Sequence, residues 1–278
     1  GIREELADVI FNISPQETPF VSNIGKKSVR NTYFEWQTDA LSAAASNAQI
    51  DGDDLSSYTA VTPTVREGNY TQIMRKDFIL ADNLEVINAA GRSSERAYQI
   101  TKTGNELKRD LEFNLCGVNN AKTAGSTSAA RETGSLNTWI STNVSAGSKG
   151  AGSGSGAART DGTQRAITET LLKTVMQSTW TSGGSPSMIM VGAHVKTVIS
   201  GFSGIAAQRY QAGDGPTTII GAADVYVSDF GSINIVPNRF SRSRDAYVLD
   251  TDLLSVATLR PMQVVDLAKT GDAQKKAM

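Results

Sequence analysis

The sequence has very few of the residues that reactive thiols and transition-metal sites need. Its 278 residues include one cysteine, Cys116, and one histidine, His194. A single cysteine excludes an intrachain disulfide and a multi-cysteine metal site, and a single histidine excludes a histidine-rich site. Such sparse use of cysteine fits a protein that is made in a reducing cytoplasm.

Catalytic and ligand-binding motifs are also missing. A Ser-His-Asp triad would need His194, and GFSGI (201–205) has its second glycine one position away from the G-x-S-x-G pattern. The glycine-rich run 147–156 lacks the G-K-[ST] ending of a phosphate loop, and DGDD (51–54) lacks the closing glutamate of an EF-hand. Three interpretations of DGDD therefore stay open: a weak Ca²⁺ contact, a solvated loop, or one side of an intersubunit salt bridge. We predict no catalytic, cofactor-binding or metal-binding residue, and therefore no enzyme.

The chain has neither an excess of charge nor a long apolar run. Lys and Arg total 27 and Asp and Glu total 28, which gives a formal net charge of −1. This balance argues against a dedicated nucleic-acid binder, whose affinity rests on excess basic charge. No apolar run approaches the ~18–20 residues that span a bilayer, and no signal peptide opens the chain. We expect a soluble protein without a membrane partner.

The N-terminal region combines an amphipathic helix with a proline-rich stretch. Residues 2–13 place apolar side chains at helical spacing. In ISPQETPFVSNIG (13–25), Pro15 and Pro19 fix φ and push the preceding residues towards extended geometry. The pattern predicts a stiff extended arm, neither helix nor central strand, that carries Phe20 and Val21 as apolar anchors.

A long two-stranded excursion and a long helix follow. Residues 32–38 alternate as a strand does, 41–60 are small, polar and acidic, and 62–80 suggest one long strand with a charged face. Residues 93–118 form the clearest helix, with Ser93 or Ser94 as its cap and an apolar stripe along it. Arg109, Asp110 and Glu112 are expected on its ordinary charged face.

The second half changes from low complexity to an α/β pattern. Residues 121–162 are rich in Ala, Gly, Ser and Thr, and their composition indicates flexible coil at a domain boundary. Only SLNTWI (135–140) is expected to dock, as a short turn. The expected later elements are helices at 163–180 and 193–202, and strands at 187–192, 223–240 (two strands around a DFGS turn), 246–250 and 262–268. We expect a polar tail after them.

These parts, in this order, resemble the major capsid (major head) proteins of tailed bacteriophages with the HK97-like fold. The most specific similarities are LADVIFNISPQETPFVSNIGK (6–26), YFEWQTD (33–39) and AGRSSERAYQITKTGNELKRDLE (90–112). IMVGAHVK (189–196) and AAQRYQAG (206–213), together with VVDLAKTGDAQKK (264–276), are similar to the second half of that family. The resemblance covers most of the chain, which ends at Met278 where relatives usually continue.

The resemblance implies an α+β fold with named parts. They are an N-terminal arm (1–31), the E-loop and its flanking strands (32–80), the spine helix of the peripheral domain (81–120), a mainly axial domain with a flexible Gly/Ser loop at 145–162 (121–250), and C-terminal strands and tail (251–278).

The resemblance also implies a function and partners. The chain would be a structural subunit that assembles into hexamers and pentamers of an icosahedral shell, which encloses double-stranded DNA without sequence-specific binding. Scaffolding, portal and decoration proteins are candidate partners, and assembly in the host cytoplasm would place the product in the virion. The alternatives are the shell of an encapsulating nanocompartment with the same fold and another structural protein of a virion. The candidate intersubunit contacts are Pro15, Pro19, Phe20, Val21, Asp51, Asp53, Asp54 and Arg66.

Overall fold

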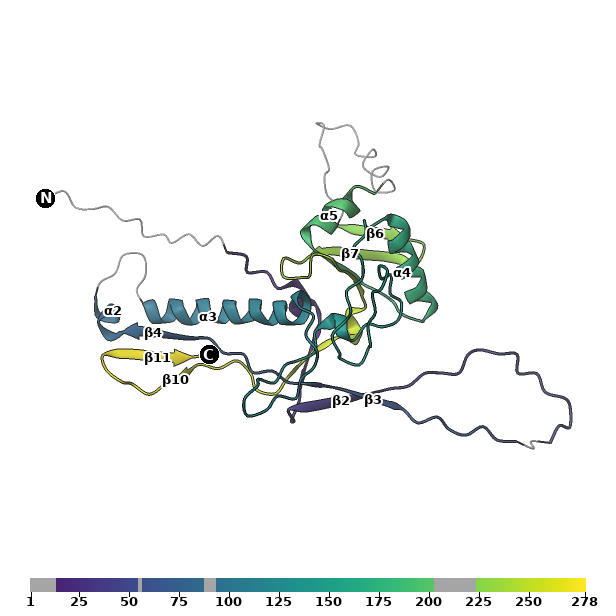
Figure 1. The fold of residues 1–278 in the computed structure, drawn as a ribbon, viewed down its shortest axis with the longest axis horizontal. Coiled ribbons are helices and arrows are strands. Elements are labelled where there is room, and N and C mark those ends of the chain that lie inside the picture. Colours follow the sequence, from purple (N-terminus) through teal and green to yellow (C-terminus); the bar gives the residue numbers. More distant parts are fainter. Residues whose placement is uncertain (1–13, 55–56, 88–93, 203–223) are drawn as a thin grey trace.

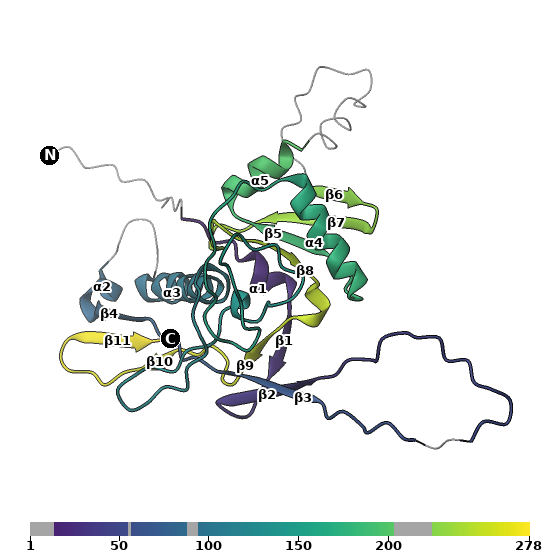
Figure 2. The same cartoon turned by 45° about the vertical axis from the view of Figure 1, so that its right-hand side comes forward.

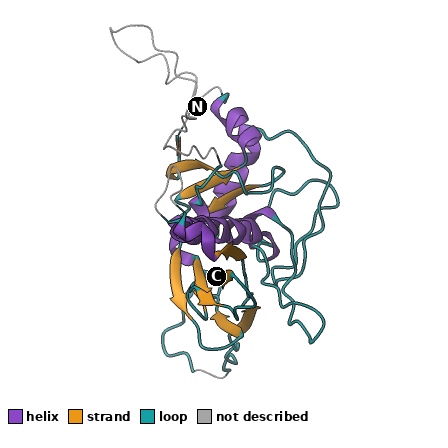
Figure 3. Ribbon diagram, turned by 90° about the vertical axis from the view of Figure 1, so that its left-hand side faces the viewer, coloured by secondary structure: helices purple, strands orange, loops and turns teal. Residues whose placement is uncertain are grey.

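The computed structural model describes residues 14–54, 57–87, 94–202 and 224–278, and it shows a mixed helix and strand fold (Figure 1). Strands lie above and below the long helix α3 (Figure 3). The α-helices are α1 (Pro19–Asn23), α2 (Asp82–Val86), α3 (Glu95–Glu112), α4 (Glu169–Thr181) and α5 (Ala193–Ser200). The strands are β1 (Gly25–Ser28), β2 (Tyr33–Thr38), β3 (Val65–Tyr70), β4 (Asp77–Ala81), β5 (Met188–Val191), β6 (Val225–Ser228), β7 (Gly231–Pro237), β8 (Ala246–Leu249), β9 (Ser255–Thr258), β10 (Val265–Asp266) and β11 (Ala273–Ala277).

A four-stranded sheet with the order β6-β7-β5-β8 forms the α/β half that the sequence predicts. Strand β5 is parallel to β7 and antiparallel to β8, and all four of its side chains are buried. Side chains alternate between the two faces of a strand. Accordingly, Ile189 and Val191 pack with the apolar residues of α4 and α5. Met188 and Met190 pack into a second core cluster on the opposite face. This strand is apolar throughout because both of its faces are covered.

The long helix α3 lies beside the antiparallel sheet β10-β11-β4 (Figure 1). Its start is set by Ser94, whose hydroxyl accepts a hydrogen bond from the backbone N–H of Ala97 at 3.2 Å. Leu107 of its apolar stripe is buried, and so is Leu80 of β4. The predicted helix is confirmed from its cap to Glu112, after which the chain continues as a π-helical turn to Gly117.

The β2–β3 hairpin extends far from the rest of the subunit (Figure 1). The two strands pair antiparallel from Tyr33 opposite Tyr70 to Thr38 opposite Val65. The described residues between them belong to no helix or strand, so the predicted two-stranded excursion is confirmed. The expectation that its tip is polar holds only in part, because large apolar side chains are also exposed there. The prediction of one strand over 62–80 is wrong, because β3 ends at Tyr70 and β4 then pairs with β11 in a different sheet.

The arm prediction for residues 13–25 is wrong at its C-terminal part. Pro19 occupies the first position of the short helix α1, where the N–H that proline lacks has no helical acceptor anyway. Strand β1 follows at once and pairs parallel with β9 (Figure 2). The helix predicted for residues 2–13 and the similarity at 206–213 lie outside the described residues.

Three further details differ from the sequence prediction. Helix α4 begins only at Glu169, because the Thr168 hydroxyl caps it by accepting from the Leu171 N–H. The tail predicted to be merely polar contains β11, whose five residues pair with β4. Within the predicted strand 262–268, only Val265–Asp266 are strand.

The connecting segment, defined here as residues 118–168, is docked against the subunit. Leu136 enters the second core cluster, and Ser135, Asn137 and Thr138 are buried with hydrogen-bonded side chains. The segment also closes antiparallel bridges on itself, one of them between Ala151 and Thr160. Most residues of its Gly/Ser part, 147–162, are exposed, which confirms that this part has almost nothing to bury. An antiparallel bridge and side-chain hydrogen bonds, among them the bond from the Arg159 guanidinium to the Ile140 carbonyl at 2.9 Å, hold it in place instead of apolar anchors.

Candidate assembly surfaces

The tip of the β2–β3 hairpin, residues 39–64, exposes large apolar side chains. The exposed fraction is 98% for Leu41, 93% for Val61, 83% for Tyr58 and 82% for Ile50. Single exposed apolar residues are common on proteins, but four on one projecting loop make the tip a candidate for contact with another molecule.

The same tip carries three of the predicted contact residues. Asp51, Asp53 and Asp54 are all exposed, and Gly52 between them adopts a positive φ of 80° that permits the tight turn. The Asp53 N–H donates to the Ile50 carbonyl at 3.1 Å and closes this turn. Three neighbouring carboxylates on a projecting turn favour contact with a cationic surface.

Arg66 lies lower on the hairpin, on β3. Its guanidinium forms an ion pair with Glu35 of β2, and the two side chains are 64% and 36% exposed. Arg66 therefore already braces the two strands of its own hairpin while part of it remains accessible to a neighbour.

The structure places Phe20 in the core of its own subunit. Phe20 is 4% exposed, and Val21 packs at the edge of the same cluster. This corrects the expectation that Phe20 fills an apolar site on an adjacent subunit, since the site is supplied by the same chain. Pro15 and Pro19 are half-buried.

Glu112 explains why Phe20 and Val21 are held there. Its carboxylate accepts hydrogen bonds from the backbone N–H groups of Phe20 at 2.8 Å and Val21 at 2.9 Å. These are among the free donors at the start of helix α1. A third bond comes from the Asn238 side-chain amide at 2.6 Å, just after β7. Glu112 thereby joins α1, α3 and the end of β7.

Burial raises the pKa of the Glu112 carboxyl, and the hydrogen bonds from Val21, Phe20 and Asn238 oppose that rise. The placement of Glu112 on an ordinary charged face is wrong, because this side chain is fully buried. No sequence signal separates it from its charged neighbours, since its donors come from about 90 and 126 residues away.

The only histidine and the only cysteine of the sequence lie in surroundings that do not indicate a reactive site. His194 is exposed at the start of α5. Cys116 is 1% exposed, and burial raises the pKa of its thiol, so it packs as a small apolar group. Among the described residues, no three His, Cys, Asp or Glu side chains gather to hold a metal ion. In that same part of the chain no helix is both long and apolar enough to cross a bilayer.

A family model described as SU10 major capsid protein matches residues 1–278. The chain belongs to the SU10 major capsid protein family. One relative is the "Major capsid protein" of Escherichia phage Phieco32, which is 42% identical over 113 residues. That match covers 40% of this chain and 32% of the relative, so it spans about a third of the relative's length.

Solved structures similar to this family member confirm the HK97-like fold. A chain of the "Cyanophage A-1(L) capsid asymmetric unit" has a TM-score of 0.64 at 12% identity, covering 99% of this chain and 91% of that one. A chain of Mycobacterium phage Cain has a TM-score of 0.60 at 12% identity, covering 99% and 86%. A chain of the "Capsid of native GTA particle computed with C5 symmetry" has a TM-score of 0.59 at 12% identity, covering 99% and 88%.

Proposed function

We propose that this chain is the subunit that builds an icosahedral phage head. Many copies, arranged as hexamers and pentamers, form a closed shell around double-stranded DNA. The observation that carries the proposal is the β2–β3 hairpin, whose tip presents four exposed apolar side chains far from the core of its own subunit. Such a tip gains free energy only by burial against another molecule, and in a shell that molecule is a second copy.

The tip supplies a free energy of useful size. Full burial of one large apolar side chain contributes about 1.5–3 kcal/mol, so four of them contribute roughly 6–12 kcal/mol per copy. Association costs about 4–15 kcal/mol, so the tip alone gives a marginal contact and further contacts must add to it. A shell assembled from individually weak contacts can form and correct itself.

We assign the parts of the subunit as the family resemblance implies. The hairpin within residues 32–80 is the E-loop, α3 is the spine of the peripheral domain, and the four-stranded sheet belongs to the axial domain. Residues 1–31 act as the arm, although Phe20 within it serves its own core. Pro15, Pro19, Val21, the three tip aspartates and Arg66 remain our proposed contacts with neighbours.

The near-neutral charge of the chain agrees with this role. A formal charge of −1 gives the wall no general affinity for phosphates. As the family resemblance implies, we also propose that double-stranded DNA is enclosed without sequence-specific binding. We further propose assembly in the host cytoplasm with scaffolding, portal and decoration proteins, a final place in the virion, and no catalytic activity.

The decisive experiment shortens the tip. Replacing residues 41–60 by a short Gly/Ser turn should leave the circular dichroism of the purified subunit unchanged and abolish particles in sedimentation and electron microscopy. The matched control replaces only the tip serines Ser42, Ser46 and Ser57 by glycine, and it should assemble normally. Normal shells from the shortened chain would overturn the proposal.

The contents of the particles separate the phage head from a nanocompartment. Nuclease-protected double-stranded DNA in particles from infected cells supports the head. Shells that hold a protein cargo and no DNA would favour the nanocompartment instead. Membership of a family of major capsid proteins favours the head.

The arm can be tested by itself. None of the described residues 14–18 belongs to either core cluster, whereas Phe20 and Ile24 both do. Deleting residues 1–18 should therefore spare the fold and weaken shells, while deleting residues 1–25 should also lower the melting temperature. Shells of normal stability from the first deletion would contradict an arm contact between subunits.

A further inference from the structure

Several hydrogen bonds from the connecting segment hold the base of the β2–β3 hairpin. The Lys122 ammonium donates to the Gly68 carbonyl on β3 at 2.8 Å. Asn69 of β3 exchanges two hydrogen bonds with the backbone of Gly134, at 2.9 and 3.4 Å. The Arg131 guanidinium donates to the Thr71 carbonyl at 2.5 Å, just beyond β3.

An aromatic contact strengthens the same junction. The ring of Trp36 on β2 meets the ring of Trp139 edge-on, with centroids 5.1 Å apart. The Lys122 ammonium lies 5.2 Å from the centre of the Trp139 ring on which it stacks. Edge-on ring pairs and cation–ring contacts both depend on geometry, so they fix an orientation as well as a distance.

The glycine-rich run has a role at this junction. Gly156 has a φ of 82°, and a Cβ atom there would come within 2.7 Å of the Lys122 side chain and 2.8 Å of the Trp139 ring. Its carbonyl accepts from the Lys122 N–H at 2.7 Å. A glycine is needed here because the backbone passes directly against the two side chains that hold the hairpin.

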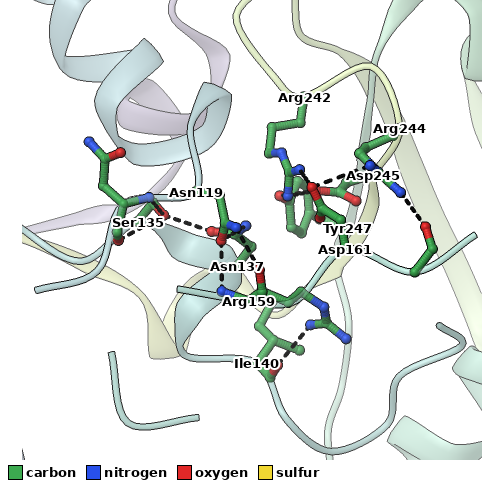
Figure 4. Close-up of polar contacts among 12 residues, drawn as sticks. Asn119, Ser135, Asn137, Ile140, Arg159, Asp161, Arg242, Arg244, Asp245 and Tyr247 are labelled. Carbon is green, nitrogen blue, oxygen red and sulfur yellow. Dashed lines mark hydrogen bonds and ion pairs between the residues drawn. The ribbon is translucent and has the colours of Figure 1, made fainter. Parts of the chain in front are cut away.

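The far end of the connecting segment is attached beside the four-stranded sheet (Figure 4). Asp161 forms an ion pair with Arg242 at 2.6 Å, and the Arg244 guanidinium donates to the Gly162 carbonyl at 2.5 Å. Both arginines lie between β7 and β8. The hydrogen bond from Arg242 lowers the pKa of Asp161, so this tie is ionised at neutral pH.

Hydrogen bonds inside the segment connect its two ends. Asn119 and Arg159 exchange two bonds, at 2.7 and 2.9 Å, and the Asn137 amide donates to Asn119 at 2.9 Å (Figure 4). Asn137 and its neighbour Ser135 are buried. A continuous set of fixed contacts therefore runs from β3 to the loop between β7 and β8.

We propose that the connecting segment is a clamp that fixes the angle between the β2–β3 hairpin and the four-stranded sheet. Lys122, Trp139 and Gly156 are its positioning residues. The consequence for the shell rests on the function proposed above: the angle decides where the hairpin tip meets the neighbouring copy, and so it sets the curvature of the shell.

Spin labels on the full-length isolated subunit test the clamp directly. Engineered cysteines replace Thr38 at the end of β2 and Ser232 on β7, and double electron–electron resonance measures the distance between their labels. The native Cys116 is 1% exposed and does not compete for the label. We expect a narrow distance distribution that broadens at least twofold in Lys122→Met and in Trp139→Leu.

Two matched variants serve as controls. Trp180→Leu removes a tryptophan that is 58% exposed on α4 and contacts Phe230, outside the clamp. Lys102→Met removes an exposed lysine on α3. Neither should broaden the distribution. Trp139→Phe, which keeps a ring against Trp36, should restore most of the narrowness.

The outcomes decide between a clamp and a simple packing contact. An unchanged distribution in both Lys122→Met and Trp139→Leu would overturn the clamp. If Trp139→Leu fails to fold, Lys122→Met decides, because its half-buried side chain belongs to neither core cluster. If a variant with a broadened distance distribution still forms shells of normal size, the link between the clamp and the curvature of the shell is overturned. Failure of the native chain to form shells would refute the proposed function without changing the spin-label result.

Discussion

Replacing Glu112 by alanine should release the N-terminal helix α1 from the subunit. The substitution removes the acceptor of three hydrogen bonds. Two of these donors, the Phe20 N–H and the Asn238 amide, are buried, and each unsatisfied buried donor costs about 1–3 kcal/mol. The expected loss of unfolding free energy is therefore roughly 2–6 kcal/mol. For a chain of this size it should lower the melting temperature by about 4 °C or more.

Glu112→Gln is the matched variant, because it keeps one oxygen in place. Phe20 and Asn238 both donate to Oε1, whereas Val21 donates to Oε2. Glutamine can retain the first two bonds and loses the third, so we expect a cost of about 1 kcal/mol. Removing a buried charge offsets part of this cost.

The measurement combines thermal unfolding with amide hydrogen exchange. In Glu112→Ala the N–H groups of Phe20 and Val21 should exchange faster, while those of β5 should stay protected. The reasoning fails if Glu112→Ala melts within about 1 °C of the native chain, or if the Phe20 amide keeps its protection.

The pH dependence gives an independent check. The folded pKa of Glu112 is raised above its ordinary value of 4.5, so the folded state binds this proton more readily than the unfolded state. The contribution of Glu112 to stability is therefore full below pH 4.5 and falls as the pH rises through the folded pKa. Glu112→Gln should lack this decline, so the difference in melting temperature between the two proteins should change within that window.

Three further predictions concern other parts of the subunit. Leu107→Asp should cost several kcal/mol, because Leu107 is 6% exposed, whereas Lys108→Ala on the outer face of α3 should cost about 0.5 kcal/mol or less; equal melting temperatures would contradict the assigned buried face. The pKa of Asp161 is lowered in the folded state, so this group contributes stability that is present above pH 3.8 and is lost as the pH falls through the folded pKa. The melting temperature of Asp161→Asn should therefore fall less steeply with decreasing pH than that of the native chain. An unchanged pH dependence of the melting temperature would contradict the ion pair with Arg242. Limited proteolysis of the free subunit should cut first within residues 41–60, and a first cut within 145–162 would show that the connecting segment is not docked.

Elements with local signals could be predicted from the sequence, and those with distant partners could not. Helix α3 has an apolar stripe and a serine cap, and β5 is a short apolar run, so both are visible in the chain itself. Strand β11 has the polar sequence AQKKA, and it is a strand because β4, nearly 200 residues earlier, pairs with it. Intrinsic strand preference depends on such neighbours more than on the residue itself.

The same limit applies to the assembly surfaces. The hairpin tip could be predicted because residues 41–60 contain no pattern that a core could use. The role of Phe20 could not be predicted. An apolar residue after two prolines does not reveal which subunit supplies the apolar site in which it packs. In the connecting segment, the docking of SLNTWI (135–140) as a short turn could be predicted and is confirmed. The hydrogen bonds that hold residues 147–162 could not be predicted, because a composition rich in glycine and serine is typical of coil. The docking of the segment depends on a few side chains, among them those of Trp139 and Arg159.

The pairing of β1 with β9 has a consequence for the order of events at the ribosome. Gly25 lies opposite Ser255, so 230 residues separate the partners along the chain. At about 5–20 residues per second, roughly 10–50 s pass between the synthesis of the two strands. Phe20 and Ile24 lack their complete site during that time, because the cluster also needs Tyr247 and Leu249. Folding of the nascent subunit therefore finishes only after β9 has been made, and a neighbouring copy meets the complete docking surface no earlier than that.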